Sequence, residues 1–425
     1  MRVDERENVF FKSQLEVSVF RRVPSSSEDV INSPVCGGVG PFPPAATMHG
    51  RKRSSAAPDD VALKAAASKL EAYQSLSEIA FRYRASRDTS PLALSLCGKL
   101  LTANPDVATL WNYVREALLL RFEGAGRCDE AAFRAGIADQ LALSASAIMR
   151  NPKSYPAWHH RQWLVERYSL GRRGDEDESG LSPAPAPAVI SLADELALCS
   201  KMLSADERNF HCWKYRRWVA NLAHARATNE AAAAAVLAAE LAFTSEAISR
   251  NFSNYSAWHA RTHLLPRAAE GPHGVALDAA ALQKELCVVQ RAVFTEPDDQ
   301  SPWFFRRWVV SRLSALIEGS LADDVSEAAA AEGAAAAAVL LEDLRELKKL
   351  EAADPECKWP LEAQAHTVAL LARSSAFAAM CAAGRVEAAE TPTAEAAAQM
   401  YERLAILDAR HAQYFSYARG KCLST

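Results

Sequence analysis

The chain has 425 residues, of which 49% are hydrophobic and 24% charged, a balance typical of folded proteins. Its 48 basic and 52 acidic side chains leave a formal net charge of −4, which gives no reason to expect nucleic acid as the main partner. The nine cysteines are scattered, without a Cys-x-x-Cys pair, and no uncharged apolar run approaches the length of a membrane span. These features exclude a zinc finger, a disulfide scaffold and a membrane span.

Two polar segments differ from the rest of the chain. Residues 1–47 contain a stretch rich in Ser, Pro and Gly without helical periodicity, so we expect a disordered N-terminal extension. An alternative is that translation begins at Met48 and that the extension is not native. Residues 171–188, rich in Gly, Pro and charged residues, predict a flexible insert that is exposed to solvent.

One motif recurs through residues 48–425, which we predict to form a single repeat domain. Five segments of eight residues end on a tryptophan, and these tryptophans lie 47, 55, 45 and 45 residues apart: Trp111, Trp158, Trp213, Trp258 and Trp303. The longest interval is the one that contains the insert 171–188. A period of this length is typical of stacked repeats.

Each of these segments predicts the start of a helix. Four residues before the tryptophan, most segments have a side chain that can cap free N–H groups: Ser154, Asn209, Asn254 and Asp299. The first segment departs from the pattern, with Val107 at the cap position. Amphipathic helical patterns precede these starts, and no segment alternates like a strand. The sequence therefore predicts an all-α solenoid of helical hairpins.

An arginine follows each of the last four tryptophans at the third position. The pairs are Trp158 and Arg161, Trp213 and Arg216, Trp258 and Arg261, and Trp303 and Arg306. We expect these side chains to be structural, with the arginines bonded to backbone or carboxylate groups between helical layers, in preference to a ligand-binding role.

Three of the segments carry a resemblance to a known family. N-P-K-S-Y-P-A-W-H-H-R-Q-W at 151–163, D-E-R-N-F-H-C-W-K-Y-R-R-W at 206–218 and N-F-S-N-Y-S-A-W-H-A-R at 251–261 resemble repeats of the protein prenyltransferase α-subunit family. Within the family they are most similar to the type II, Rab-modifying branch. The resemblance implies a right-handed α–α superhelix, crescent-shaped and wrapped around a separate β subunit.

The resemblance also implies a function. The chain would be the α subunit of a heterodimeric Rab geranylgeranyltransferase, inactive without its β subunit. This cytoplasmic enzyme would transfer geranylgeranyl from geranylgeranyl diphosphate to C-terminal cysteines of Rab GTPases presented by a Rab escort protein. No cofactor is expected on this chain alone: zinc would lie in the β subunit, with magnesium left open for the diphosphate, and His49 is the one candidate metal ligand here. The alternatives are an α subunit of farnesyltransferase or type I geranylgeranyltransferase, and a non-catalytic helical-repeat scaffold.

The site residues follow from the chemistry that the resemblance implies. Cleavage of a prenyl–diphosphate bond leaves negative charge on the departing oxygens, which fixed cations and hydrogen-bond donors stabilise. Matched by motif, Lys153 and His211 would be catalytic. Tyr155, Asn209 and Phe210 would contact the diphosphate or line the subunit interface. Without the resemblance, Lys153 is a solvated turn residue and His211 an interface residue.

Overall fold

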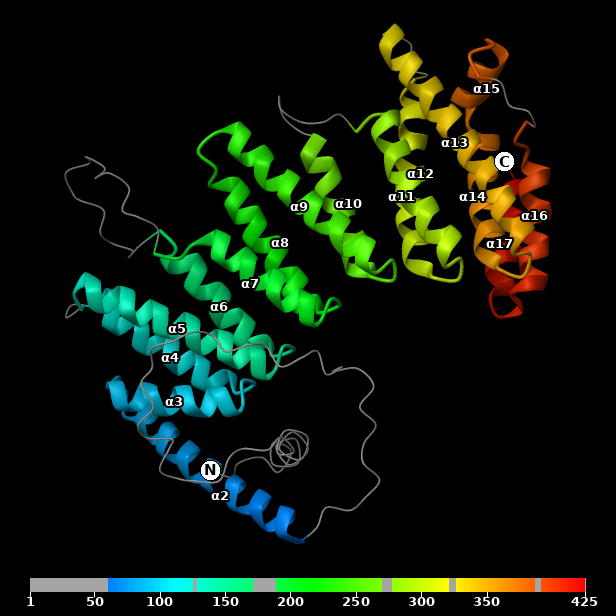
Figure 1. The fold of residues 1–425 in the computed structure, drawn as a ribbon. Coiled ribbons are helices and arrows are strands. Elements are labelled where there is room, and N and C mark those ends of the chain that lie inside the picture. Colours follow the sequence, from blue (N-terminus) through cyan, green and yellow to red (C-terminus); the bar gives the residue numbers. More distant parts are fainter. Residues whose placement is uncertain are drawn as a thin grey trace. The chain divides into compact units, whose positions relative to one another are not determined.

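The computed structural model describes residues 60–124, 128–170, 189–269, 277–320, 326–386 and 391–424 (Figure 1). The extension predicted at 1–47, the insert predicted at 171–188 and His49 lie outside the described residues. The elements are α2 (Asp60–Ala85), α3 (Pro91–Ala103), α4 (Ala108–Glu123), α5 (Glu130–Arg150), α6 (Tyr155–Tyr168), α7 (Leu192–Ala205), α8 (Phe210–Ala225), α9 (Glu230–Arg250), α10 (Tyr255–Ala269), α11 (Ala279–Thr295), α12 (Gln300–Gly319), α13 (Glu327–Ala353), α14 (Lys358–Arg373), α15 (Ser375–Ala382), α16 (Ala394–Leu407), the 3₁₀ turn η1 (Ala409–His411) and α17 (Ala412–Leu423). The prediction of an all-α fold is confirmed, because all of these elements are helical.

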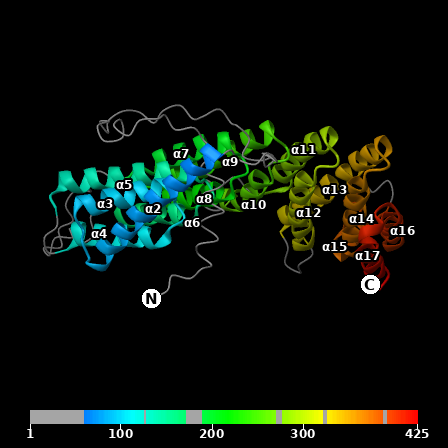
Figure 2. The same ribbon diagram turned by 90° about the horizontal axis from the view of Figure 1, so that it is seen from below.

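The helices form two compact units that divide within α8, between Tyr215 and Arg216. In both units, successive helices pack as hairpins, for example α5 with α6 and α11 with α12. First helices contact the first helix of the next hairpin, as α3 does with α5, and second helices contact second helices, as α4 does with α6. Within the second unit, α14, α16 and α17 lie side by side (Figure 2). Stacked hairpins of this kind are the predicted helical repeats.

Each of the five tryptophans fixes the turn that precedes its helix. The indole Nε1–H donates to the carbonyl oxygen six residues earlier, at 2.8 to 2.9 Å in every repeat. The bonded pairs are Trp111 with Pro105, Trp158 with Pro152, Trp213 with Glu207, Trp258 with Phe252 and Trp303 with Pro297. A buried indole needs such an acceptor, and phenylalanine could not replace the bond because its ring has no donor.

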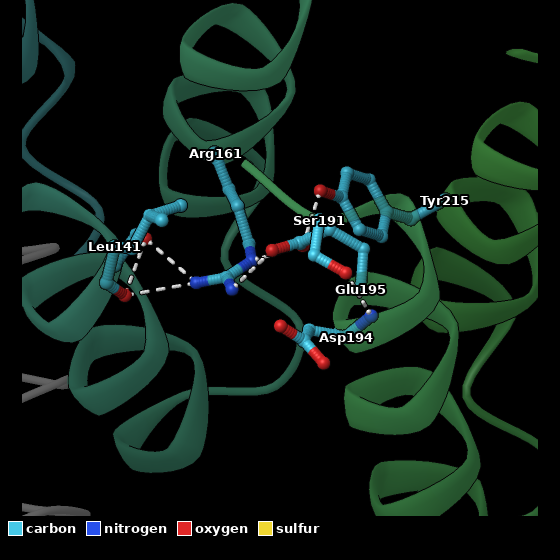
Figure 3. A network of polar contacts seen from close by, with 7 residues as sticks. Leu141, Arg161, Ser191, Asp194, Glu195 and Tyr215 are labelled. Atoms are coloured by element: carbon cyan, nitrogen blue, oxygen red, sulfur yellow. Dashed lines mark hydrogen bonds and ion pairs between the residues drawn. The ribbon is translucent and has the colours of Figure 1, made fainter. Parts of the chain in front are cut away.

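The four arginines join successive repeats. Each guanidinium binds a carboxylate on the first helix of the next hairpin: Arg161 with Glu195, Arg216 with Glu240, Arg261 with Glu285 and Arg306 with Asp343. In the first of these pairs, Arg161 Nε and Nη2 donate to Glu195 at 2.7 and 2.8 Å, and the Tyr215 hydroxyl donates to the same carboxylate at 2.7 Å (Figure 3). Arg161 Nη1 also donates to Leu141 O at 2.8 Å. The buried charges are therefore fully paired, which is the condition under which a buried ion pair is tolerated.

The first repeat lacks this ion pair. Val114 takes the position of the arginine, and Gln140 lies eighteen residues before Trp158, where the later repeats have their acid. Gln140 Oε1 is buried without a hydrogen-bond partner among the described residues. The ion pair is therefore replaced by two neutral side chains in this repeat.

The predicted helix caps are confirmed at three of the four positions. Asn209, Asn254 and Asp299 accept hydrogen bonds from N–H groups at the starts of α8, α10 and α12. The prediction for Ser154 is wrong, because its side chain makes no capping bond. Its hydroxyl donates instead to Pro105 O of the preceding turn, at 3.0 Å, so the serine joins two turns and leaves its own helix start uncapped.

A further hairpin follows the five marked by tryptophan. In α13 and α14, Leu361 takes the tryptophan position, eighteen residues after Asp343, and Cys357 takes the cap position. The thiol of Cys357 lies 3.5 Å from Pro297 O, the same link to the preceding turn that Ser154 makes. The repeat therefore continues with different residues at its marker positions.

By length and hydropathy alone, α9 would qualify as a membrane span, with a mean hydropathy of 1.5 over 18 residues, and so would α14 and α15 if that bent pair counted as one span. The sequence criterion of an uncharged apolar run did not select α9, because acidic residues interrupt its run of alanines. The alanines nevertheless raise the mean hydropathy of the helix. Glu240 of α9 is buried and paired with Arg216, and α9 packs on α10. The buried, ion-paired acid and the packing within a hairpin identify α9 as a helix of the repeat. Composition alone, for a single helix, is weak evidence for a membrane span.

Candidate functional site

The turns before α6 and α8 bring most of the predicted site residues together. Lys153 belongs to the turn that precedes α6, and Asn209 and Phe210 lie at the start of α8. All three line one cavity of about 230 Å³, together with Asp206 and Arg208. The indole bonds of the two repeats hold both turns in place, so the cavity is positioned by the repeat itself.

The cavity is rich in positive charge. The side chains of Lys153 and Arg208 are exposed, and neither makes a hydrogen bond or an ion pair within the described part of the chain. The carboxylate of Asp206 also lines the cavity, so the formal balance at its wall is one net positive charge. Sequence reasoning missed Arg208, although it lies five residues before Trp213, just as Lys153 lies five residues before Trp158.

Two exposed aromatic side chains lie beside this cavity. Tyr155 is the first residue of α6 and is 67% exposed, and Phe210 is the first residue of α8 and is 54% exposed. Their ring centroids are 6.4 Å apart, and Tyr155 also meets the ring of His211 edge-on at 4.3 Å. Exposed aromatic rings beside a charged pocket are typical of a surface that a partner or ligand covers.

His211 does not line the cavity, and only 6% of its surface is exposed. Burial, together with the positive charges of Lys214 and Lys153, holds the pKa of His211 below its usual range. The imidazole is therefore neutral near pH 7, able to donate one hydrogen bond but not to supply a cation. Its catalytic role stays a prediction.

Asn209 acts within the fold. Its Oδ1 accepts from the N–H groups of His211 and Cys212 at 3.0 and 3.1 Å, and its Nδ2 donates to Pro152 O at 3.1 Å. These bonds hold the start of α8 against the turn that carries Lys153. The predicted contact of Asn209 with a diphosphate stays a prediction, and the structure shows that this side chain fixes the distance between the two turns.

A larger cavity, of about 370 Å³, lies in the second unit between α12, α14 and α17. None of the residues predicted to contact the diphosphate line it, whereas Trp303 and Arg306, predicted to be structural, do. Two solvent-accessible cationic side chains at its wall are ion-paired: Arg307 binds Glu362, and Lys358 binds Asp408. Despite its size, this cavity offers no unpaired cation of the kind that an anionic ligand needs.

The described residues contain no group of three or more His, Cys, Asp or Glu side chains that could hold a metal ion. The candidate ligand His49 lies outside them.

Comparison with known proteins supports the repeat pattern. A family profile described as protein prenyltransferase alpha subunit repeat matches residues 137–168, 192–223, 237–268 and 282–313. Each match contains one of the four tryptophan–arginine pairs. The four matched segments coincide with α5–α6, α7–α8, α9–α10 and α11–α12.

Curated relatives share part of their length with the chain. Geranylgeranyl transferase type-2 subunit alpha of Rattus norvegicus is 41% identical over 187 residues, which cover 44% of this chain and 29% of the relative. The protein of the same name from Candida albicans is 29% identical over 163 residues, covering 38% of this chain and 39% of the relative. Geranylgeranyl transferase type-2 subunit alpha 2 of Arabidopsis thaliana is 30% identical over 184 residues, covering 43% and 25%. The chain thus matches well under half the length of each.

One solved structure has a similar fold. The structure of "Candida albicans protein geranylgeranyltransferase-I complexed with GGPP" aligns with 89% of this chain and 96% of its own, at a TM-score of 0.51 and 17% identity. At this identity the likeness concerns the fold alone. The comparisons therefore show that the chain contains four protein prenyltransferase alpha subunit repeats and that, over part of its length, it is similar to type-2 alpha subunits of geranylgeranyl transferase.

Proposed function

We propose that this chain is the α subunit of a heterodimeric protein geranylgeranyltransferase type II. It would support transfer of geranylgeranyl from geranylgeranyl diphosphate to C-terminal cysteines of Rab GTPases, which a Rab escort protein presents in the cytoplasm. The observation that carries the proposal is the Lys153 ammonium, without a partner in the described residues, on a cavity next to a helix start. The names of the rat, Candida and Arabidopsis relatives support the choice of type II.

Lys153 would stabilise the leaving group. When the bond between the prenyl carbon and the diphosphate breaks, negative charge builds on the departing oxygens, and a fixed cation lowers the energy of that state. The starts of α6 and α8 add the positive ends of two helix dipoles near the same cavity. The neutral His211, held behind Tyr155 and Phe210 in contact with both rings, is suited to keep these aromatic side chains in place.

The site needs a second subunit. A cavity of about 230 Å³ walled by charged and polar residues cannot bury a long isoprenoid chain, which requires an apolar pocket. The exposed rings of Tyr155 and Phe210 offer a surface that such a subunit would cover. The proposed β subunit would supply the lipid pocket and a zinc ion that activates the cysteine thiolate of the acceptor.

Co-expression with a type II β subunit tests the proposal. We expect a stoichiometric complex that transfers geranylgeranyl to a Rab protein when escort protein is present, and much less without it. Transfer to short C-a-a-X peptides in preference to escort-bound Rab would instead identify a farnesyltransferase or type I α subunit. Unchanged Rab modification after combined Lys153→Ala and His211→Ala substitution would favour a non-catalytic scaffold.

A further inference from the structure

Lys153 and Arg208 occupy the same position in two consecutive repeats, five residues before the tryptophan. In other repeats the residue at this position is not a cation: it is Asp106, Ser253, Asp298 and, counted from Leu361, Glu356. The hairpin of α16 and α17 has Arg410 there, counted from Phe415, but Arg410 does not line the cavity. Lys153 and Arg208 thus fall in neighbouring turns, and both line the cavity of about 230 Å³.

In two other repeats this position links one turn to the next. Asp106 Oδ2 accepts from Asn151 Nδ2 at 3.0 Å, and the Ser253 hydroxyl donates to Asp299. Neither the Lys153 ammonium nor the Arg208 guanidinium makes such a bond within the residues that the structure describes. Two like charges at the wall of one small cavity repel each other, and the single carboxylate of Asp206 at that wall offsets only one of them, so the remaining positive charge favours an anionic ligand.

We infer that Arg208 binds the diphosphate of the prenyl donor together with Lys153, as the second cation of the site. This inference rests on the proposed function. The guanidinium can donate two parallel hydrogen bonds to phosphate oxygens, whereas the ammonium acts as a point charge. Two cations suit a ligand whose charge is spread over two phosphate groups, and their net effect exceeds the opposing charge of Asp206. The sequence motif could not show this, because it marks the turn and not the cavity that the two turns share.

The test uses the full chain assembled with its β subunit. The variants are Arg208→Ala, Arg208→Lys and Lys153→Ala, with Arg121→Ala as the matched control, because Arg121 is an exposed arginine of α4 outside the cavity. The inhibition constants of inorganic pyrophosphate and of inorganic phosphate are measured, along with KM for geranylgeranyl diphosphate. We expect Arg208→Ala to weaken pyrophosphate inhibition about tenfold and Arg208→Lys to recover part of it. Phosphate inhibition should change far less, and Arg121→Ala should change neither.

Three outcomes would overturn the inference. If Lys153→Ala weakens pyrophosphate binding and Arg208→Ala does not, Arg208 lies outside the site while the proposed function stands. If Arg208→Ala weakens only the association of the subunits, with pyrophosphate inhibition of the assembled heterodimer unchanged, Arg208 is a subunit contact. If the wild-type heterodimer neither transfers prenyl groups nor binds pyrophosphate, the proposed function fails and the inference fails with it.

Discussion

The interior of the repeats and the turns at their ends use cations in opposite ways. In the interior, Arg161 and its equivalents are buried against carboxylates of the next hairpin. At the turns, Lys153 and Arg208 face a cavity without a partner in the described part of the chain. The larger cavity of the second unit resembles the interior, since Arg307 and Lys358 at its wall are ion-paired. The two cavities therefore differ in whether the cations at their walls are paired, and this difference, not cavity size, identifies the smaller cavity as the candidate site.

Removing an interior carboxylate should have the largest effect. Glu195→Ala leaves the buried guanidinium of Arg161 without its partner, and we expect the free energy of unfolding to fall by about 3–5 kcal/mol, measured by urea denaturation of the full chain. Arg208→Ala, which removes an exposed arginine, should change it by less than about 0.5 kcal/mol.

A double variant sharpens this comparison. Arg161→Val combined with Glu195→Gln copies the neutral pair Val114 and Gln140 of the first repeat, and it should recover much of the stability that Glu195→Ala loses, because no unpaired charge stays buried. A loss of less than about 1 kcal/mol for Glu195→Ala would mean that the ion pair is no stronger than a surface pair.

At the turns, the expected effect is on activity. Lys153→Ala should lower kcat/KM for prenyl transfer by the assembled heterodimer about 100-fold, because charge on the leaving diphosphate loses its fixed cation. Unfolding of the chain should stay unchanged, since the Lys153 ammonium makes no hydrogen bond or ion pair among the described residues. Equal losses of stability and activity would contradict the separation between turn and interior.

The buried histidine of the interior predicts a pH dependence. His160 packs against Trp111, both of its ring nitrogens lack a partner within the described residues, and burial lowers its pKa to about 3. The positive charges of Arg115, His159 and Arg161 contribute to this lowered pKa. The unfolded chain, with a histidine pKa of about 6.5, takes up the proton first as the pH falls.

The stability that this histidine contributes is therefore present above pH 6.5 and is lost between pH 6.5 and about 3. We expect about 2 kcal/mol of this loss between pH 7 and pH 5. His160→Gln, neutral throughout, should remove that share of the pH dependence of urea unfolding. An unchanged pH dependence in the variant would show that His160 is solvated in the folded state.

The smallest effect should come from the larger cavity. Lys358→Ala breaks a partly exposed pair with Asp408, so we expect less than about 1 kcal/mol of lost stability. Prenyl transfer should change less than about threefold, because the lysine is already neutralised by its partner. A loss as great as that for Lys153→Ala would place the anion site in the second unit.

The sequence predicted the hairpins because tryptophan and the helix caps lie close together in the chain. It did not predict which acids pair with the arginines, although each acid lies eighteen residues before the next tryptophan position. The hairpin of α13 and α14 lies within the predicted repeat domain but was not among its five tryptophan-centred repeats, because Leu361 replaces the tryptophan and Trp359 lies two residues away from the expected register. Ser154 was misjudged because a hydroxyl can donate as well as accept, and the choice depends on a carbonyl 49 residues away.

The cavity could not be predicted from the sequence for a similar reason. The motifs identified Lys153, Asn209 and Phe210 one by one, but the space between two turns depends on how one hairpin rests on the next. Arg208 could have been found by comparing equivalent positions of the repeats, a comparison that requires the register to be known first.

The bond from each indole to the carbonyl six residues earlier has a consequence for how such an array can be modified. The tryptophan holds the turn, and the residue five positions before it differs in charge from repeat to repeat: aspartate, lysine, arginine and serine occupy it in successive turns of the same form. Turns of the same form thus accept residues of different charge at this position. A single substitution at this position can therefore change the charge of one turn while the indole bond that holds the turn is kept.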